Sequence, residues 1–221
     1  MHDRSRWSVL IPAAGNGERI GRGPKIHLAI AGRSFLDCVL AAADGISDDI
    51  LVAVPRAMAE PATAAACTFV VGGATRQETV RILMEQSRHD YLLIHDVARP
   101  LCTPDLMRRV ADAAAETGAA AAVGPVDVPV ALLAEGYIAG ARSAASVGIF
   151  QTPLAFHRDV LAAAYRHADA DQRQAQSTLE LVLATGTAVR AVAAERSNFK
   201  ITTPQDLLMA EALEAAASRP R

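Results

Sequence analysis

Short apolar runs alternate along the chain with longer segments in which apolar residues recur every three or four positions. The first pattern is typical of buried strands and the second of amphipathic helices. Their alternation predicts an α/β fold, Rossmann-like, whose mainly parallel sheet is sandwiched by helices. Strands are expected at 8–11, 50–54, 68–71, 91–94, 119–123 and 188–193. Helices are expected at 35–44, 57–66, 75–87, 104–117, 157–167, 177–184 and 204–217.

This pattern changes between residues 126 and 149. Valines there alternate with Asp127 and Pro129, and Gly136 and Gly140 divide the segment into short extended pieces. Proline cannot donate a hydrogen bond to a sheet ladder, which argues against a central strand. The segment therefore predicts an irregular, protruding β-arm on a single domain that spans residues 1–221.

Composition narrows the class of protein. The chain has 221 residues and a formal net charge of −2, so it lacks the basic field that nucleic-acid-binding proteins usually carry. Charges interrupt the alanine-rich windows too often for a membrane span, and the polar N-terminus shows no secretory signal. Cys38, Cys67 and Cys102 lack metal-binding spacing and are expected to be reduced. We therefore expect a cytoplasmic protein that binds neither nucleic acid nor membrane.

The first expected strand leads into a glycine-rich loop with two positive charges, Arg19 and Lys25. Glycine lets backbone N–H groups approach an anion closely, because no Cβ stands in the way. The spacing fits neither the dinucleotide fingerprint nor the P-loop. Asp37, where a dehydrogenase would have its ribose ligand, falls inside an expected helix. A simple turn would need no such charges, so the loop favours polyphosphate binding.

A second pair of glycines, Gly72 and Gly73, follows the strand at 68–71. Thr75 and Glu78 would form a capping box for the next helix, which explains most of this segment structurally. Capping does not explain the two glycines, whose bare backbone could admit a flat base. Both interpretations stay open at this point.

Acidic and basic residues follow two later parts of the pattern. Asp96 comes directly after the strand at 91–94, at the sheet edge where open α/β folds bind ligands. Its carboxylate suits a divalent cation, although it could instead cap a loop and pair with Arg99. Lys200 is expected on a short strand before the last helix, where an exposed lysine by itself carries no function.

Five motifs in order resemble the 2-C-methyl-D-erythritol 4-phosphate cytidylyltransferase family, which is related to the ribitol-phosphate cytidylyltransferases. They lie at 11–25, 72–76, 95–100, 151–153 and 198–206, so the resemblance covers nearly the whole chain. It implies a fold of the nucleotide-diphospho-sugar transferase type and a homodimer joined through the arm. It also implies Mg²⁺-dependent transfer of CMP from CTP to 2-C-methyl-D-erythritol 4-phosphate, with release of pyrophosphate.

The resemblance also assigns residues by motif position. Arg19, Lys25 and Lys200 would be the catalytic cations on the triphosphate, Asp96 would hold Mg²⁺, and Arg99 would face the acceptor. The nucleotide would contact Ala13, Ala14, Gly15, Asn16, Gly17, Gly72, Gly73, Arg76 and Thr79.

Three departures from the family pattern fall on the acceptor side. Val128 follows Asp127 where the family has threonine, and Ala144 stands where the arm usually carries an arginine, the nearest one being Arg142. Gln176-Ser177-Thr178 replaces a Thr-Asp-Asp run. Two alternatives therefore accompany the main hypothesis: a paralogue acting on another polyol phosphate or a phosphonate, and an inactive homologue that only binds nucleotide.

Overall fold

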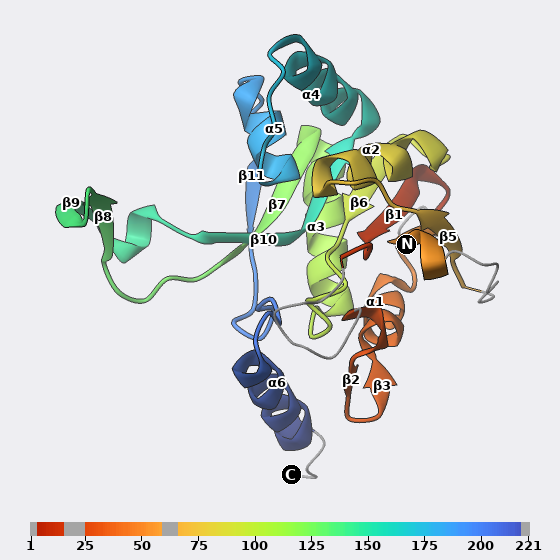
Figure 1. Cartoon of the computed structure of the whole chain (residues 1–221), viewed down its shortest axis with the longest axis horizontal. Helices are drawn as coiled ribbons and strands as arrows, with labels where there is room; N and C mark the ends of the chain where they lie inside the picture. The colour runs from red at the N-terminus through yellow and green to blue at the C-terminus, as the bar shows by residue number, and fades with distance from the viewer. Residues whose placement is uncertain (1–3, 16–24, 59–65, 218–221) are drawn as a thin grey trace.

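The computed structural model describes residues 4–15, 25–58 and 66–217, and these form an α/β fold around one large sheet (Figure 1). The seven strands lie in the order β11-β7-β10-β6-β1-β4-β5. All neighbours pair in parallel except β10, which runs antiparallel to both β6 and β7. The strands are β1 (Trp7–Pro12), β4 (Asp49–Val54), β5 (Thr68–Val71), β6 (Tyr91–Ile94), β7 (Ala119–Gly124), β10 (Ile149–His157) and β11 (Arg190–Ala193). The predicted fold class is confirmed.

Helices cover both faces of this sheet. Because side chains alternate along a strand, Val9 of β1 faces one hydrophobic core and Leu10 the other. The first core takes its helical members from α1 (Phe35–Ala43), α3 (Pro104–Thr117) and α6 (Pro204–Ala217). The second takes them from α2 (Arg76–Gln86), α4 (Arg158–Ala170) and α5 (Thr178–Ala184). No helix among the described residues has the length and apolar character needed to cross a bilayer.

Local signals in the sequence set several helix ends. Ser34 and Asp37 form a reciprocal capping box at the start of α1, so Asp37 serves the helix, as expected. Thr103 caps α3, and Gly118 ends it with a left-handed φ of 83°, a conformation that costs glycine little.

Cys38, Cys67 and Cys102 are free, as expected. Burial raises the pKa of the Cys102 thiol to about 12.

Several predicted elements were wrong. β10 was not expected, because Pro153 interrupts its apolar run. In the structure its register against β7 shifts between Gln151 and Leu154. Of the helix expected at 57–66, residues 57 and 58 lie in a 3₁₀ turn, η3 (Arg56–Met58), and most of the rest, 59–65, lies outside the described residues. Lys200 lies in irregular chain after β11, not on a strand. Further short elements also appear: η1 (Arg4–Arg6), η2 (Lys25–His27), β2 (Ala29–Ile30), β3 (Arg33–Ser34) and η4 (Ala144–Ser146).

The predicted arm is a β-hairpin, β8 (Val130–Ala134) and β9 (Tyr137–Arg142), that extends away from the sheet (Figure 1). Glu135 and Gly136 join the strands with positive φ values of 52° and 84°, the combination that a tight two-residue hairpin turn requires. Large apolar side chains on it are exposed, including Leu133, Tyr137 and Ile138. A two-stranded hairpin is marginally stable by itself, so this surface is suited to a partner.

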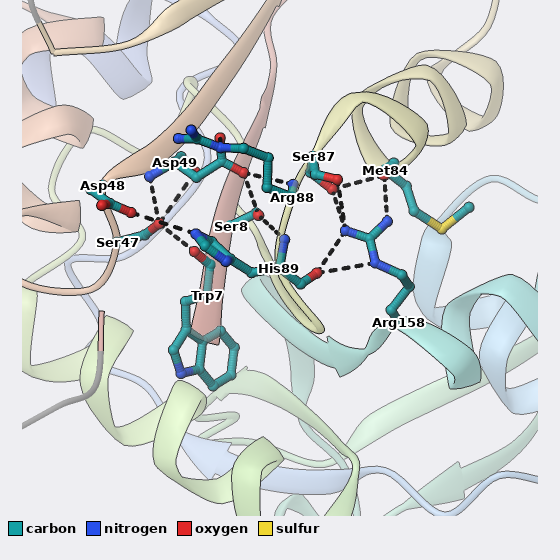
Figure 2. A network of polar contacts seen from close by, with 10 residues as sticks. All are labelled: Trp7, Ser8, Ser47, Asp48, Asp49, Met84, Ser87, Arg88, His89 and Arg158. Atoms are coloured by element: carbon teal, nitrogen blue, oxygen red, sulfur yellow. Dashed lines mark hydrogen bonds and ion pairs between the residues drawn. The ribbon is translucent and has the colours of Figure 1, made fainter. Parts of the chain in front are cut away.

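A polar network braces the edge of the sheet where β1, β4 and β6 begin (Figure 2). Asp49 accepts hydrogen bonds from Ser8 Oγ and from the backbone and side chain of Arg88. Arg158 donates to the carbonyl oxygens of Met84, Ser87 and His89 at 2.6 to 3.0 Å. The network fixes the loop between α2 and β6 and leaves the opposite edge for ligands.

Candidate active site

The carboxyl ends of β1, β5 and β6 surround a cavity of about 420 Å³. This volume lies in the range of sites that hold small ligands. The carboxyl edge of a parallel sheet is also where open α/β folds bind them. The cavity is lined by Pro12, Ala13, Ala14, Gly15, Lys25, Gly73, Ala74, Thr75, Arg76, Thr79, Asp96, Val97, Ala98 and Lys200. Most of the site residues expected from the sequence therefore lie together.

Asp96 is the acidic centre of this cavity and is 7% exposed. Arg76 Nη2 lies 2.8 Å from Asp96 Oδ1, and Lys200 Nζ lies 2.9 Å from Oδ2. Burial alone would raise the pKa of Asp96, but these two cations hold it well below its usual range. Asp96 is thus ionised at neutral pH. Its carboxylate pairs with Arg76 and Lys200. The alternative in which Asp96 pairs with Arg99 is therefore wrong.

Positive charge outweighs negative charge along the lining. Lys25, Arg76 and Lys200 contribute three cations, and Asp96 contributes the one carboxylate among the lining residues. Lys25 Nζ donates to the Ile201 carbonyl oxygen at 2.7 Å, so the segment that carries Lys200 also holds Lys25. Such an excess of cations, arriving from separate elements, suits a ligand with several negative charges.

The glycine pair after β5 has a packing reason. A Cβ on Gly72 would lie closer than 3.0 Å to the Cβ of Ala14, which real Cβ atoms essentially never do. Thr79 Oγ1 accepts from the Gly73 N–H at 3.1 Å and fixes this turn to α2. Thr75 caps α2 as expected, but the Glu78 carboxylate accepts from Ala74 N–H rather than completing the box at Thr75.

The turn after β6 is held by buried polar groups. His95 is fully buried, and burial lowers its pKa to about 4, so the ring is neutral at pH 7. Its Nε2 lies 3.1 Å from the Arg99 carbonyl oxygen, which can only accept, so Nε2 carries the proton. The backbone N–H of Asp96 donates to Thr152 Oγ1 at 3.0 Å. These contacts fix Asp96 at the cavity.

Other expected site residues do not reach this cavity or cannot be placed. Arg99 is 9% exposed, does not line the cavity, and donates from Nη1 to the Asn198 carbonyl oxygen at 2.7 Å. Asn16, Gly17 and Arg19 lie outside the described residues.

Sequence reasoning missed three residues that support the site. Thr152 contacts Asp96, Thr178 Oγ1 accepts from Arg76 Nη1 at 3.2 Å, and Asn198 joins β10 to the segment that carries Lys200. The first and last lie in motifs that carry the family resemblance, which was the one available signal. Their roles depend on contacts between residues 46 to 102 positions apart.

Comparison with known protein families assigns residues 7–215 to the family described as "IspD: 2-C-methyl-D-erythritol 4-phosphate cytidylyltransferase". The chain belongs to the IspD family. Its IspD relative from Thermus thermophilus is 44% identical over 208 residues, covering 93% of this chain and 96% of the relative. The relative from Deinococcus radiodurans is 41% identical over 210 residues, covering 94% and 89%. Both are named 2-C-methyl-D-erythritol 4-phosphate cytidylyltransferase.

Solved IspD structures share the fold. The crystal structure from Thermus thermophilus matches with a TM-score of 0.80 and 39% identity, covering 95% of this chain and 99% of the other. A 4-diphosphocytidyl-2C-methyl-D-erythritol synthase from Anaerococcus prevotii matches with a TM-score of 0.81 at 22% identity, covering 96% of this chain and 100% of the other, which supports the fold alone. The family resemblance deduced from the motifs is therefore confirmed.

Proposed function

We propose that this chain is a cytidylyltransferase that transfers CMP from CTP to 2-C-methyl-D-erythritol 4-phosphate and releases pyrophosphate. The single observation that carries the proposal is the cavity at the carboxyl edge of an IspD-family fold, which Lys25, Arg76, Lys200 and Asp96 line together. Relatives at 41% and 44% identity carry this activity in their names.

In the proposed reaction, an acceptor phosphate oxygen forms a bond to the α-phosphorus of CTP. The bond from that phosphorus to the bridging oxygen breaks, and the electron pair leaves with pyrophosphate. The nucleophile is already an anion, so no strong general base is needed; His95, neutral and fully buried, is not used as one. The task is to bring two anions together and to stabilise the leaving charge, which fixed cations do.

Lys25 and Lys200 are proposed to bind the triphosphate. Arg19, assigned from its motif, is proposed as a third cation on it. Lys200 is suited to this because its chain segment also accepts the hydrogen bond from Lys25. Ala13, Ala14 and Gly15 would line the nucleotide, and Gly73 and Thr79 would lie near the cytosine and ribose. The close packing of Gly72 against Ala14 would hold these two loops side by side.

The donor set fits a magnesium ion carried by the nucleotide. Mg²⁺ is usually held by one or two carboxylates together with substrate phosphates and water, and Asp96 supplies one buried carboxylate at the cavity. Arg76 and Lys200 each occupy one oxygen, which leaves further lone pairs on both. When bound, the ion would neutralise charge on the phosphates. Asp96 would hold it.

The exposed hairpin supports a homodimer, which we propose forms through the arm. Leu133, Tyr137 and Ile138 are each more than 70% exposed, an arrangement that a second copy of the chain would cover. Arg142 ends β9 and is the arginine on the arm nearest to the position filled by Ala144. We further propose that the protein is located in the cytoplasm.

Pyrophosphate release tests the proposed acceptor. The full chain is incubated with CTP, Mg²⁺ and one acceptor at a time: 2-C-methyl-D-erythritol 4-phosphate, ribitol 5-phosphate, or a phosphonate of similar size. We expect the highest kcat/KM with the first. A higher value with another acceptor would replace the proposed substrate, in line with the departures at Val128 and Ala144.

A further inference from the structure

Asn198 lies two residues before Lys200, in the irregular chain between β11 and α6, and is fully buried. Its Nδ2 donates to Gln151 Oε1 at 2.8 Å and to the Thr152 carbonyl oxygen at 3.0 Å. The Thr152 carbonyl can only accept, which determines the amide atom that faces it. One side chain thus attaches the Lys200 segment to the beginning of β10.

The backbone of Asn198 is held as well. Arg99 Nη1 donates to the Asn198 carbonyl oxygen at 2.7 Å, and the Arg99 N–H donates to the Asp96 carbonyl oxygen at 3.0 Å. Arg99 therefore links Asn198 to the turn that carries Asp96. Two residues of extended chain span about 7 Å at most, so fixing Asn198 restricts where the Lys200 backbone can lie.

The stability of the fold alone does not explain why a polar side chain lies at position 198. Its Oδ1 is buried and has no hydrogen-bond partner among the residues that the structure describes. A buried polar atom without a partner destabilises the folded state, and an apolar side chain would avoid that cost. The amide is better explained by what its Nδ2 holds in place.

We propose that Asn198 is a positioning residue that holds Lys200 against Asp96, and so toward the triphosphate of CTP. The proposal rests on the function proposed above. It assigns Asn198 no contact with substrate: the residue acts through Lys200, whose Nζ lies 2.9 Å from Asp96 Oδ2. Gln151 and Thr152 are the anchor points for this arrangement.

Gly124 offers a second, milder way to disturb the same contact. A Cβ at this position would lie 2.5 Å from Gln151 Nε2 and 3.1 Å from Gln151 Cδ. The atoms that would have to move are the far end of a flexible side chain. Gly124→Ala should therefore displace the Gln151 amide from Asn198 while the strands keep their pairing.

A double-mutant cycle on CTP affinity tests the proposal. The dissociation constant for CTP is measured by calorimetry with Mg²⁺ present, for the full-length wild type, Asn198→Ala, Lys200→Ala and the double variant. We expect Asn198→Ala to weaken CTP binding about tenfold in the wild-type background, as supporting residues often do. In the Lys200→Ala background the same change should have almost no effect. An equal loss in both backgrounds would overturn the proposal.

Arg158→Ala is the matched control for lost stability. Arg158 makes its contacts at the opposite edge of the sheet (Figure 2), so its removal should lower Tm and leave CTP affinity unchanged. Gly124→Ala should weaken CTP binding in the same direction as Asn198→Ala but by less, because the bond to the Thr152 carbonyl is kept. It carries the same cycle if Asn198→Ala does not fold. A wild type that fails to bind CTP would contradict the proposed function; an additive cycle in a protein that binds CTP would contradict only the role of Asn198.

Discussion

Gly72→Ala tests whether close packing between two loops shapes the nucleotide cavity. The added methyl group would lie closer than 3.0 Å to the Cβ of Ala14 and 3.3 Å from Thr79 Oγ1. Carbon atoms in contact lie about 3.5 to 4.0 Å apart, so the two loops must separate by on the order of 1 Å. Ala14 lines the cavity, so this movement enlarges the site where the nucleotide is proposed to bind.

Two magnitudes follow from that displacement. Overpacking of this kind costs about 1 to 3 kcal/mol of unfolding free energy, which corresponds to a Tm about 2 to 12 °C lower in a chain of this size. A displacement near 1 Å at a reacting site can lower turnover by about 100-fold. Differential scanning calorimetry measures the first quantity, and pyrophosphate release at saturating CTP measures the second.

Two further variants make this test specific. Gly140→Ala introduces the same methyl group on the arm, at an ordinary 3.7 Å from Leu132 Cδ1, and should leave Tm unchanged. Combining Gly72→Ala with Ala14→Gly removes the opposing methyl group and should restore most of the lost Tm. Wild-type Tm and turnover in Gly72→Ala, or no recovery in the double variant, would refute the packing argument.

Three other outcomes are expected. Lys25→Ala should lower turnover by about 10²- to 10³-fold with little change in Tm, because the ammonium serves charge rather than the core; near-normal turnover would contradict its assignment to the triphosphate. Asp49→Asn should cost about 1 to 3 kcal/mol at pH 7. Burial raises the pKa of Asp49, but hydrogen bonds from Ser8 and Arg88 outweigh it, so the pKa is lowered in the folded state. The difference in unfolding free energy between wild type and Asp49→Asn should therefore shrink as the pH falls below about 4. A difference that stays constant in denaturant titrations across this pH range would contradict the role of Asp49. Ile138→Asp on the arm should shift the proposed dimer toward monomer in sedimentation velocity experiments, and an unchanged sedimentation coefficient would argue against an arm-mediated dimer.

Strong periodicity and local signals made most of the fold predictable. The strands β5 and β6 and the helices α3 and α6 have the predicted bounds, since apolar runs mark the strands and apolar periodicity marks the helices. β10 was missed because its pairing is non-local: it enters between β6 and β7 in the antiparallel sense. No pattern within its own nine residues specifies that neighbourhood.

In the candidate site, too, residue identities could be predicted from local motifs, whereas contacts between distant segments could not. Lys25, Asp96 and Lys200 could be named from motifs, but nothing in their spacing indicated that Lys200 would meet a carboxylate 104 residues away. The expected acceptor role of Arg99 stays a prediction, but nothing in its motif indicated that the guanidinium would donate to the Asn198 carbonyl. A motif fixes the residue type at a position, whereas the direction of its side chain depends on which distant segments pack against it.

Direct identification of the product tests the central claim. The full chain is incubated with CTP, 2-C-methyl-D-erythritol 4-phosphate and Mg²⁺, and the mixture is followed by ³¹P NMR, with Lys25→Ala as the matched control. We predict two coupled ³¹P resonances from the diphosphate that joins cytidine to the acceptor in the product. They should appear together with an equal amount of pyrophosphate, and both should be strongly reduced in the control. Tight CTP binding without any such product would contradict the account and leave a nucleotide-binding homologue that does not catalyse the transfer.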